Sequence, residues 1–200
     1  MENNRSICLD RIMRIIVIGN SPQLLLAAKG RDIDSFDVVI RTGNFILDGF
    51  KQYTGTKTSI WCNRWCKMMD HPSTGDILSD VSQVWLSDID QREFDQQPVE
   101  YVSHVNKKTQ VRYFSKQLLT ANLHEYEPTL GMIGVLMALN IYSQHDVSIT
   151  GFGVDITSSN FVGTYWNQQY NRRTKESHHS FLRESILLKK MIHNDVIKQL

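Results

Sequence analysis

The chain has 200 residues, which suits one domain with a single sizeable core. Its hydrophobic fraction of 41%, charged fraction of 22% and net charge of +1 are typical of a soluble globular protein and favour no nucleic-acid partner. No segment approaches the roughly 18 apolar residues of a membrane span. We therefore predict a polar tail at residues 1–10, a single domain at residues 11–200 and no transmembrane segment.

The three cysteines, Cys8, Cys62 and Cys66, have no repeated spacing that would indicate a disulfide framework. We interpret them as free thiols of a reducing cytosol, with zinc binding as the alternative.

Strands and helices alternate along the first half of the chain. Arg14–Ile18 is a β-branched apolar run bounded by Gly19, which is typical of a buried central strand. Ser21 offers an N-cap oxygen and Pro22 fits the first helical position, so a short helix is expected at residues 24–29. Further strands are predicted at residues 37–41, 58–62, 83–87 and 99–105.

The second half continues this alternation. A helix is predicted at residues 115–123, and residues 129–141 are so apolar that their helix should be buried on most sides. Asp146–Thr150 is a predicted strand, and a last helix is expected at residues 180–198. Its apolar stripe would comprise Phe181, Leu188, Ile192 and Val196. The order favours an α/β, Rossmann-like sandwich around a mostly parallel sheet.

A first candidate site piece lies where the first strand ends. Ligands of open parallel sheets bind beyond such strand ends. Gly19 would let the backbone come close to a ligand, and the amide of Asn20 can donate to a phosphate or ribose oxygen. Because Gly19, Asn20 and Ser21 form neither a dinucleotide fingerprint nor a Walker sequence, a plain tight turn is the alternative.

A second piece begins the apolar helix. Helix N-termini present free N–H groups and a positive dipole end to an anionic or ribose group. Thr129 and Leu130 stand at this start, and Gly131 would leave room for a ligand. In the alternative, Thr129 is only a cap, and Gly131 and Gly134 only allow close packing.

A third piece precedes the last helix. The dipole at the start of a helix disfavours the imidazolium, which would keep His178 or His179 neutral and able to accept a proton. Glu184 is five residues beyond His179, so the two do not share a helix face, but Glu184 could tether the preceding loop. A solvated histidine pair is the alternative.

In chain order, these pieces resemble the sialylmotifs of the sialyltransferases of glycosyltransferase family 29. Residues 16–41, 49–50 and 55–58 match the large motif, and residues 128–131, 136–139 and 151–153 match the small motif. His179 and Glu184 match the very small motif, a histidine followed after four residues by a glutamate. Tyr165 and Trp166 match the aromatic pair of the motif between them. The resemblance covers about three quarters of the chain.

The resemblance implies a variant of the GT-A fold and transfer of sialic acid, with inversion, from CMP-sialic acid to a glycan such as a galactoside. It implies no divalent cation and no cofactor. By the same resemblance His179 deprotonates the acceptor hydroxyl, Asn20 contacts the donor phosphate, and Arg41, Glu184 and His178 have supporting positions. The residues assigned to the nucleotide sugar are Gly19, Asn20, Ser21, Asn44, Thr129, Leu130, Gly131, Gly151, Phe152, Gly153, Thr164, Tyr165 and Trp166.

This sequence departs from the family pattern at three places. Asn44 is displaced by one residue relative to the motif Arg-x-Asn that begins at Arg41. Thr164 stands where the family carries a phosphate-binding histidine, so we expect that contact from Tyr165 first, with His178 or Arg172 as alternatives. The cysteines that link the motifs of animal enzymes are missing, which favours a bacterial, cytoplasmic protein, either free or peripheral at the inner membrane face.

Two further features follow from the sequence. Residues 157–177 are polar and aromatic, and a segment of that length is typical of a lid over a bound ligand. The nearest metal-binding pattern is Asp88-Ile-Asp90, which is the main alternative to a metal-independent reaction. Two other functions stay open: use of CMP-Kdo or another CMP-nonulosonic acid, and a catalytically silent CMP- or glycan-binding module.

Overall fold

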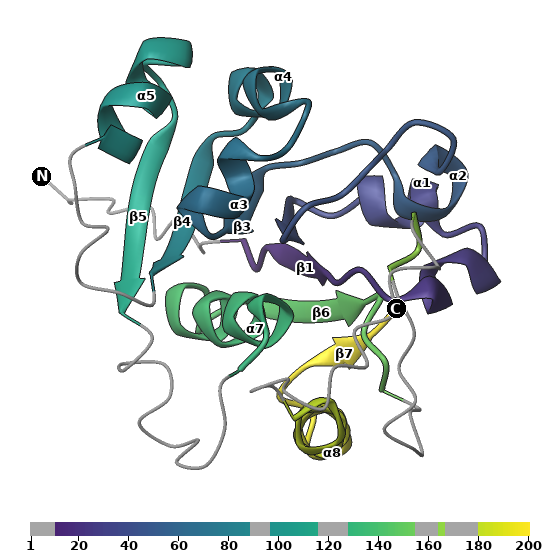
Figure 1. The fold of residues 1–200 in the computed structure, drawn as a ribbon. Coiled ribbons are helices and arrows are strands. Elements are labelled where there is room, and N and C mark those ends of the chain that lie inside the picture. The colour runs from purple at the N-terminus through teal and green to yellow at the C-terminus, as the bar shows by residue number, and fades with distance from the viewer. Residues whose placement is uncertain (1–10, 89–96, 116–127, 155–163, 167–179) are drawn as a thin grey trace, which may run out of the picture.

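One seven-stranded parallel sheet organises the molecule (Figure 1). The computed structural model describes residues 11–88, 97–115, 128–154, 164–166 and 180–200. The strand order is β5-β4-β3-β2-β1-β6-β7, and all six pairings between neighbours are parallel. The strands are β1 (Arg14–Ile18), β2 (Val38–Thr42), β3 (Ile60–Asn63), β4 (Gln83–Asp88), β5 (Gln110–Ser115), β6 (Asp146–Thr150) and β7 (Lys198–Gln199).

Helices cover both faces of this sheet, as expected for parallel strands. On one face lie α7 (Leu130–Ile141) and α8 (Phe181–His193). The other face carries the 3-10 helix η1 (Pro22–Leu26), α1 (Gly30–Asp34), α2 (Lys51–Thr54), α3 (Trp65–Met69), α4 (Thr74–Asp80) and α5 (Gln97–Val105). The sequence prediction of an α/β sandwich is confirmed.

The central strands are apolar on both faces because each face contacts a helical layer. Ile15 and Val17 pack against α7, whereas Ile16 and Ile18 point to the layer that contains η1 and α1. The six most deeply buried residues of α7 share no single stripe, so this helix is buried on most of its circumference, as predicted. Burial on both faces explains why β1 is a continuous β-branched run.

Some predicted elements are corrected by the structure. Residues 99–105, predicted as a strand, belong to helix α5. In this helix Val102 is buried, whereas Val99 is exposed. The edge strand β5 was not predicted, and Ser115, expected to begin a helix, ends it. The helix expected at residues 24–29 is the earlier 3-10 helix η1, followed by Ala27 in extended conformation. Residues 116–123 lie outside the described part.

The last predicted helix is shorter than expected. Helix α8 ends at His193, and Asp195 then adopts a positive φ of 55°, which breaks the helix before β7 begins. Leu188 is buried on the expected stripe, but Val196 is 48% exposed because it lies beyond the end of the helix. Among the described helices, none is long and apolar enough to cross a membrane.

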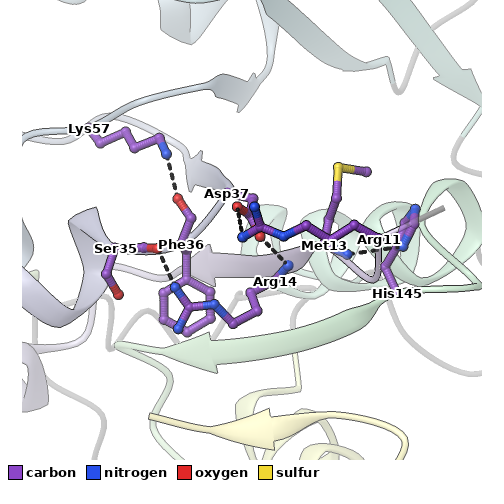
Figure 2. Close-up of polar contacts among 8 residues, drawn as sticks. All are labelled: Arg11, Met13, Arg14, Ser35, Phe36, Asp37, Lys57 and His145. Atoms are coloured by element: carbon purple, nitrogen blue, oxygen red, sulfur yellow. Dashed lines mark hydrogen bonds and ion pairs between the residues drawn. The ribbon is translucent and has the colours of Figure 1, made fainter. Parts of the chain in front are cut away.

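The amino-terminal ends of the central strands carry charged contacts (Figure 2). The Asp37 carboxylate accepts hydrogen bonds from Arg14 N at 2.8 Å and from the Arg11 guanidinium at 3.2 Å. The backbone hydrogen bond from Arg14 is the main cause that lowers the pKa of Asp37. The Arg14 guanidinium donates to Ser35 O and lies 5.2 Å from the centre of the Phe36 ring.

The carboxyl-terminal ends of β1 and β6 form a topological switch point. From β1 the strand order runs through β2 to β5 in one direction, whereas β6 and β7 lie on the other side of β1. Loops that leave two such strands diverge to opposite sides and open a crevice, which is where ligands of open α/β sheets bind. The sequence-predicted pieces after β1 and β6 therefore lie at the expected place.

Candidate functional site

The turns after β1 and β6 are in direct backbone contact. Gly19 N donates to Thr150 O at 2.9 Å, and Ser21 N donates to Gly151 O at 2.8 Å. A Cβ atom at Gly19 would lie 2.4 Å from Gly151 O, and Gly151 has a positive φ of 71°. Glycine at these positions lets the backbones of the two turns touch each other. The space that the missing side chain of Gly19 leaves is therefore filled by Gly151 and not by a ligand.

Asn20 and Ser21 are held by neighbouring segments. The Asn20 amide donates from Nδ2 to Thr42 O at 2.7 Å, which ties the β1 turn to the end of β2. Ser21 is buried and its hydroxyl accepts a hydrogen bond from Gln23 N at 3.3 Å, as expected of an N-cap. The Asn20 amide has a second N–H and an oxygen that can still bind a ligand.

The turn at residues 43–46, which carries Asn44, is held by four buried side chains. Trp61 Nε1 donates to Gly43 O at 2.8 Å, and Asn63 Nδ2 donates to Asn44 Oδ1, also at 2.8 Å. His71 Nε2 bonds Phe45 O at 2.7 Å, and the Tyr165 hydroxyl donates to Ile46 O at 2.7 Å and accepts from Ile46 N at 3.1 Å. We name these four side chains, Trp61, Asn63, His71 and Tyr165, the turn frame.

Arg41 supports the same region from inside the protein. Its guanidinium is buried and donates to Thr54 O, Lys57 O and the Thr58 hydroxyl at 2.8 to 3.2 Å. It also lies 5.3 Å from the centre of the Phe45 ring. Desolvation lowers the pKa of Arg41 to about 10, so it remains a cation at neutral pH. Arg41 therefore holds the 54–58 segment, and its supporting position at a donor site stays a prediction.

Thr129 and Glu184 join the small-motif piece to the very-small-motif piece. Thr129 caps α7 by accepting from Met132 N at 3.2 Å. Both of its own donors go to Glu184: the backbone N–H to Oε1 at 2.6 Å and the hydroxyl to Oε2 at 2.8 Å. Glu184 is only 6% exposed, and this burial raises its pKa to about 7, against the opposing effect of the two Thr129 hydrogen bonds. Glu184 therefore tethers the start of α7, and the preceding loop that it was expected to hold lies outside the described residues.

The glycines of α7 serve packing. A Cβ atom at Gly131 would lie 2.9 Å from Phe152 Cε1, and one at Gly134 would lie 2.6 Å from Thr42 Cγ2. The alternative interpretation of both glycines, close packing, is therefore the one that this geometry favours. Leu130 is close to the 43–46 turn, because a Cβ atom at Gly43 would lie 3.9 Å from Leu130 Cδ1 and 3.4 Å from Asn20 Nδ2.

The 151–153 turn borders a pocket on the η1 side of the sheet. The pocket has a volume of about 200 Å³, and Gly151 and Phe152 line it together with η1, Tyr53 of α2 and the β7 strand. Gly153 follows as a half-buried residue, and Val154 O accepts from the Ser185 hydroxyl of α8 at 2.7 Å. The turn is thus fixed from α8 on one side and open to the pocket on the other.

Only three residues of the predicted lid are described. Tyr165 N donates to Asn20 O at 3.0 Å, so this segment crosses the β1 turn. Tyr165 is buried, which raises the pKa of its phenol, and its hydroxyl is occupied by Ile46. The predicted donation of this hydroxyl to a phosphate would require its hydrogen bond to Ile46 O to break. Thr164 is also buried, and Trp166 is half-buried with a shielded indole N–H that bonds no described residue.

The proposed base is not described. In this part of the chain, residues 157–163 and 167–179 lie outside the described ranges, and they include Arg172, His178 and His179. His179 directly precedes Ser180, the residue before helix α8 begins at Phe181.

No group of potential metal ligands gathers within the described ranges. Asp90 and the Asp88 side chain fall outside them, so the Asp88-Ile-Asp90 pattern stays untested. Cys62 and Cys66 are free thiols, as predicted, and burial raises the pKa of Cys62 to about 12. Cys8 lies outside the described part.

Sequence reasoning missed the turn frame apart from Tyr165. Asn63 gave one usable signal, a polar residue that closes an apolar strand at the carboxyl edge of the sheet. Trp61 gave no such signal, since a tryptophan inside a strand is usually a residue of the hydrophobic core. His71 is a histidine without a partner pattern in the sequence, and its hydrogen bond to Phe45 O is a structural contact.

The chain resembles known proteins over most of its length. The family model for glycosyltransferase family 29 (sialyltransferase) matches residues 3–196. The chain is 26% identical over 216 residues to the curated CMP-N-acetylneuraminate-beta-galactosamide-alpha-2,3-sialyltransferase 4 of Mus musculus, covering 94% of this chain and 64% of that protein. The chain thus spans slightly less than two thirds of that relative.

Two solved structures share the fold. The crystal structure of a mammalian sialyltransferase superposes with a TM-score of 0.65, and that of a mammalian sialyltransferase in complex with Gal-beta-1-3GalNAc-ortho-nitrophenol with 0.59. Each is 20% identical, with coverage of 94% of this chain and 69% of the other. With a family model that spans nearly its whole length, the chain belongs to glycosyltransferase family 29, the sialyltransferases.

Proposed function

We propose that this protein transfers sialic acid from CMP-sialic acid to a hydroxyl of a glycan such as a galactoside, with inversion and without a metal ion. Family membership supports the reaction class. The observation that carries the proposal is the meeting of Asn20, the 43–46 turn and Leu130 at the switch point, with Glu184 bonded to Thr129 beside them. Segments distant in the sequence thereby form one potential donor site.

The donor phosphate is assigned to amide and backbone donors. Asn20 and Asn44 each have an amide N–H that no described residue accepts, and the start of α7 adds the positive end of a 12-residue helix dipole. Neutral donors of this kind can stabilise the charge that develops on the departing CMP. We prefer them to the Tyr165 hydroxyl, because Ile46 already occupies that group.

The proposed chemistry is a single displacement. His179 takes the proton of the acceptor hydroxyl while its oxygen bonds to the anomeric carbon of sialic acid. The bond from that carbon to the phosphate oxygen breaks, and CMP leaves with the electron pair. Glu184, in the first turn of α8, links the helix that follows His179 to the donor side at Thr129. A lid formed by residues 157–177 would exclude water from the reacting centre.

Turnover with defined donors tests this proposal. We expect CMP release from CMP-Neu5Ac in the presence of a galactoside acceptor, with unchanged rate in EDTA. Release of CMP only from CMP-Kdo would show that the donor sugar is Kdo and not sialic acid. Loss of turnover in EDTA, with recovery in magnesium or manganese, would make Asp88 and Asp90 candidate metal ligands. CMP binding without turnover of either donor would favour the silent binding module. The GT-A-variant fold label and the cytoplasmic location remain predictions from the sequence.

A pair of histidine variants tests the base. We expect His179→Ala to lower turnover by roughly 10²- to 10⁴-fold, the usual size of a general-base effect, with little change in CMP affinity. His178→Ala is the matched control and should cost less. The reverse order would move the base by one residue.

A further inference from the structure

A chain of hydrogen bonds with one possible direction runs from the backbone of Arg64 to the Asn44 side chain. Arg64 N, which can only donate, bonds Asn63 Oδ1 at 2.9 Å. Asn63 must therefore present its NH₂ group in the other direction, and Nδ2 donates to Asn44 Oδ1 at 2.8 Å. We name this series of hydrogen bonds from Arg64 N through Asn63 to Asn44 the relay. Its free end is the NH₂ group of Asn44, which has no hydrogen bond to any described residue.

The position of Asn44 makes that free end relevant. Gly43 has a positive φ of 65°, which lets the chain turn sharply after β2 and places the turn beside Asn20 and Leu130. Asn44 is half-buried, whereas Asn63 at the end of β3 is completely buried. Asn63 is thus out of reach of a ligand and can act only through Asn44.

We propose that Asn63 is a positioning residue that holds the Asn44 amide with its NH₂ group toward an anionic phosphate of the ligand. The inference rests on the proposed function, because it takes the ligand to be a CMP-linked donor. A freely rotating asparagine could present its oxygen instead, and an oxygen that faces a phosphate is repelled. By fixing the direction in advance, Asn63 removes that cost and makes the site selective for an anion over a neutral nucleoside.

Asn63→Asp tests the direction of the relay. The carboxylate still accepts from Arg64 N but cannot donate to Asn44, so the Asn44 amide must turn its NH₂ group inward and its oxygen outward. We expect calorimetry to show CMP binding weakened by roughly 10- to 100-fold, the value of a hydrogen bond to a charged group. Cytidine, which lacks the phosphate, should bind within about twofold of wild type.

Two further variants separate positioning from loss of structure. Asn63→Ala removes both hydrogen bonds but leaves Asn44 free to turn toward the phosphate, so its CMP affinity should fall less than that of Asn63→Asp. Asn106→Asp is the matched control, because Asn106 also donates through Nδ2, to Leu78 O and Ser79 O beneath the opposite end of the sheet. It should leave CMP binding unchanged.

A double-mutant cycle with Asn44→Ala provides the decisive comparison. If Asn63 acts through Asn44, Asn63→Asp should cost less than twofold in CMP affinity once Asn44 is alanine. A full loss in that background, or equal losses for CMP and cytidine, would overturn the inference while the proposed donor stands. Absence of CMP binding by the wild-type protein would instead overturn the proposed function, and this inference with it.

Discussion

The two ends of the central strands hold their polar groups in opposite ways. At the amino edge, charged side chains contact one another near solvent: in the Arg11–Asp37 pair, the Arg11 side chain is 80% exposed and that of Asp37 27% (Figure 2). At the carboxyl edge, the turn frame and Glu184 are buried, and the groups that hold the turn are uncharged. The Glu184 carboxyl group accepts hydrogen bonds from a hydroxyl and a backbone N–H, both of Thr129.

This difference determines how much each contact should matter. Exposed ion pairs contribute little to the free energy of unfolding, because both charges are also well hydrated when they are apart. A buried donor or acceptor that loses its partner retains the full cost of desolvation. The carboxyl edge should therefore dominate the effects of mutation, and the opposite pKa shifts of Glu184 and Asp37 should give the two edges opposite responses to pH.

The largest effect is expected for Glu184→Ala. The substitution leaves the backbone N–H and the hydroxyl of Thr129 without their acceptor, at a cost of roughly 2 to 4 kcal/mol for two part-buried donors. Chemical denaturation at pH 5.5 measures it. Glu184→Gln keeps an acceptor for Thr129 N and should lose less than half as much; equal losses would show that the hydrogen bonds do not carry the effect.

The pH dependence of stability should differ between the edges. Because the pKa of Glu184 is raised from 4.5 to about 7, its contribution is fully present below pH 4.5 and is lost as the pH rises through about 7. The shift corresponds to about 3 kcal/mol. Asp37, with a lowered pKa, contributes above its ordinary value of 3.8 and loses that contribution as the pH falls.

Denaturation of wild type and Glu184→Gln between pH 4.5 and pH 8 separates these contributions. The wild-type free energy of unfolding should decrease relative to the variant across this range, since only the wild type carries the titrating carboxyl. Parallel curves would contradict the raised pKa.

Tyr165→Phe should have a smaller effect at the same edge. It removes the hydroxyl that holds Ile46, but Ile46 is 39% exposed, so water can replace part of the bonding and the loss should be about 1 kcal/mol. Tyr53→Phe is the control, because the Tyr53 hydroxyl bonds no residue in the described ranges. A large loss of turnover with unchanged stability would indicate that the Tyr165 hydroxyl, and not the asparagine amides, contacts the donor phosphate.

The smallest effect is expected for Asp37→Asn at the amino edge. The amide still accepts from Arg14 N, so the change mainly removes the exposed pairing with Arg11. The loss should decrease further in high salt, because screening weakens exposed pairs. A loss larger than that of Tyr165→Phe would reverse the comparison between the edges.

The sequence by itself determined the fold class and the strands and helix that carry the candidate site. The strands at Arg14–Ile18 and Asp146–Thr150 and the apolar helix after Thr129 were predictable, because local patterning records burial on both faces of a parallel sheet. Strand-end chemistry then directed attention to Asn20 and Gly151. The prediction of some short elements was wrong. The pattern of residues 99–105 fits a strand and a helix almost equally well, and tertiary contacts that bury Val102 decide for the helix.

Only the tertiary structure decided what the individual side chains touch. Gly19 and Gly151 approach each other because β1 and β6 are neighbours, although about 130 residues separate them in the sequence. Glu184 bonds Thr129 across 55 residues, and Tyr165 bonds Ile46 across 119. Hydrogen bonds at such separations depend on how the elements pack, and no local pattern records the direction in which an asparagine amide or a tyrosine hydroxyl will point.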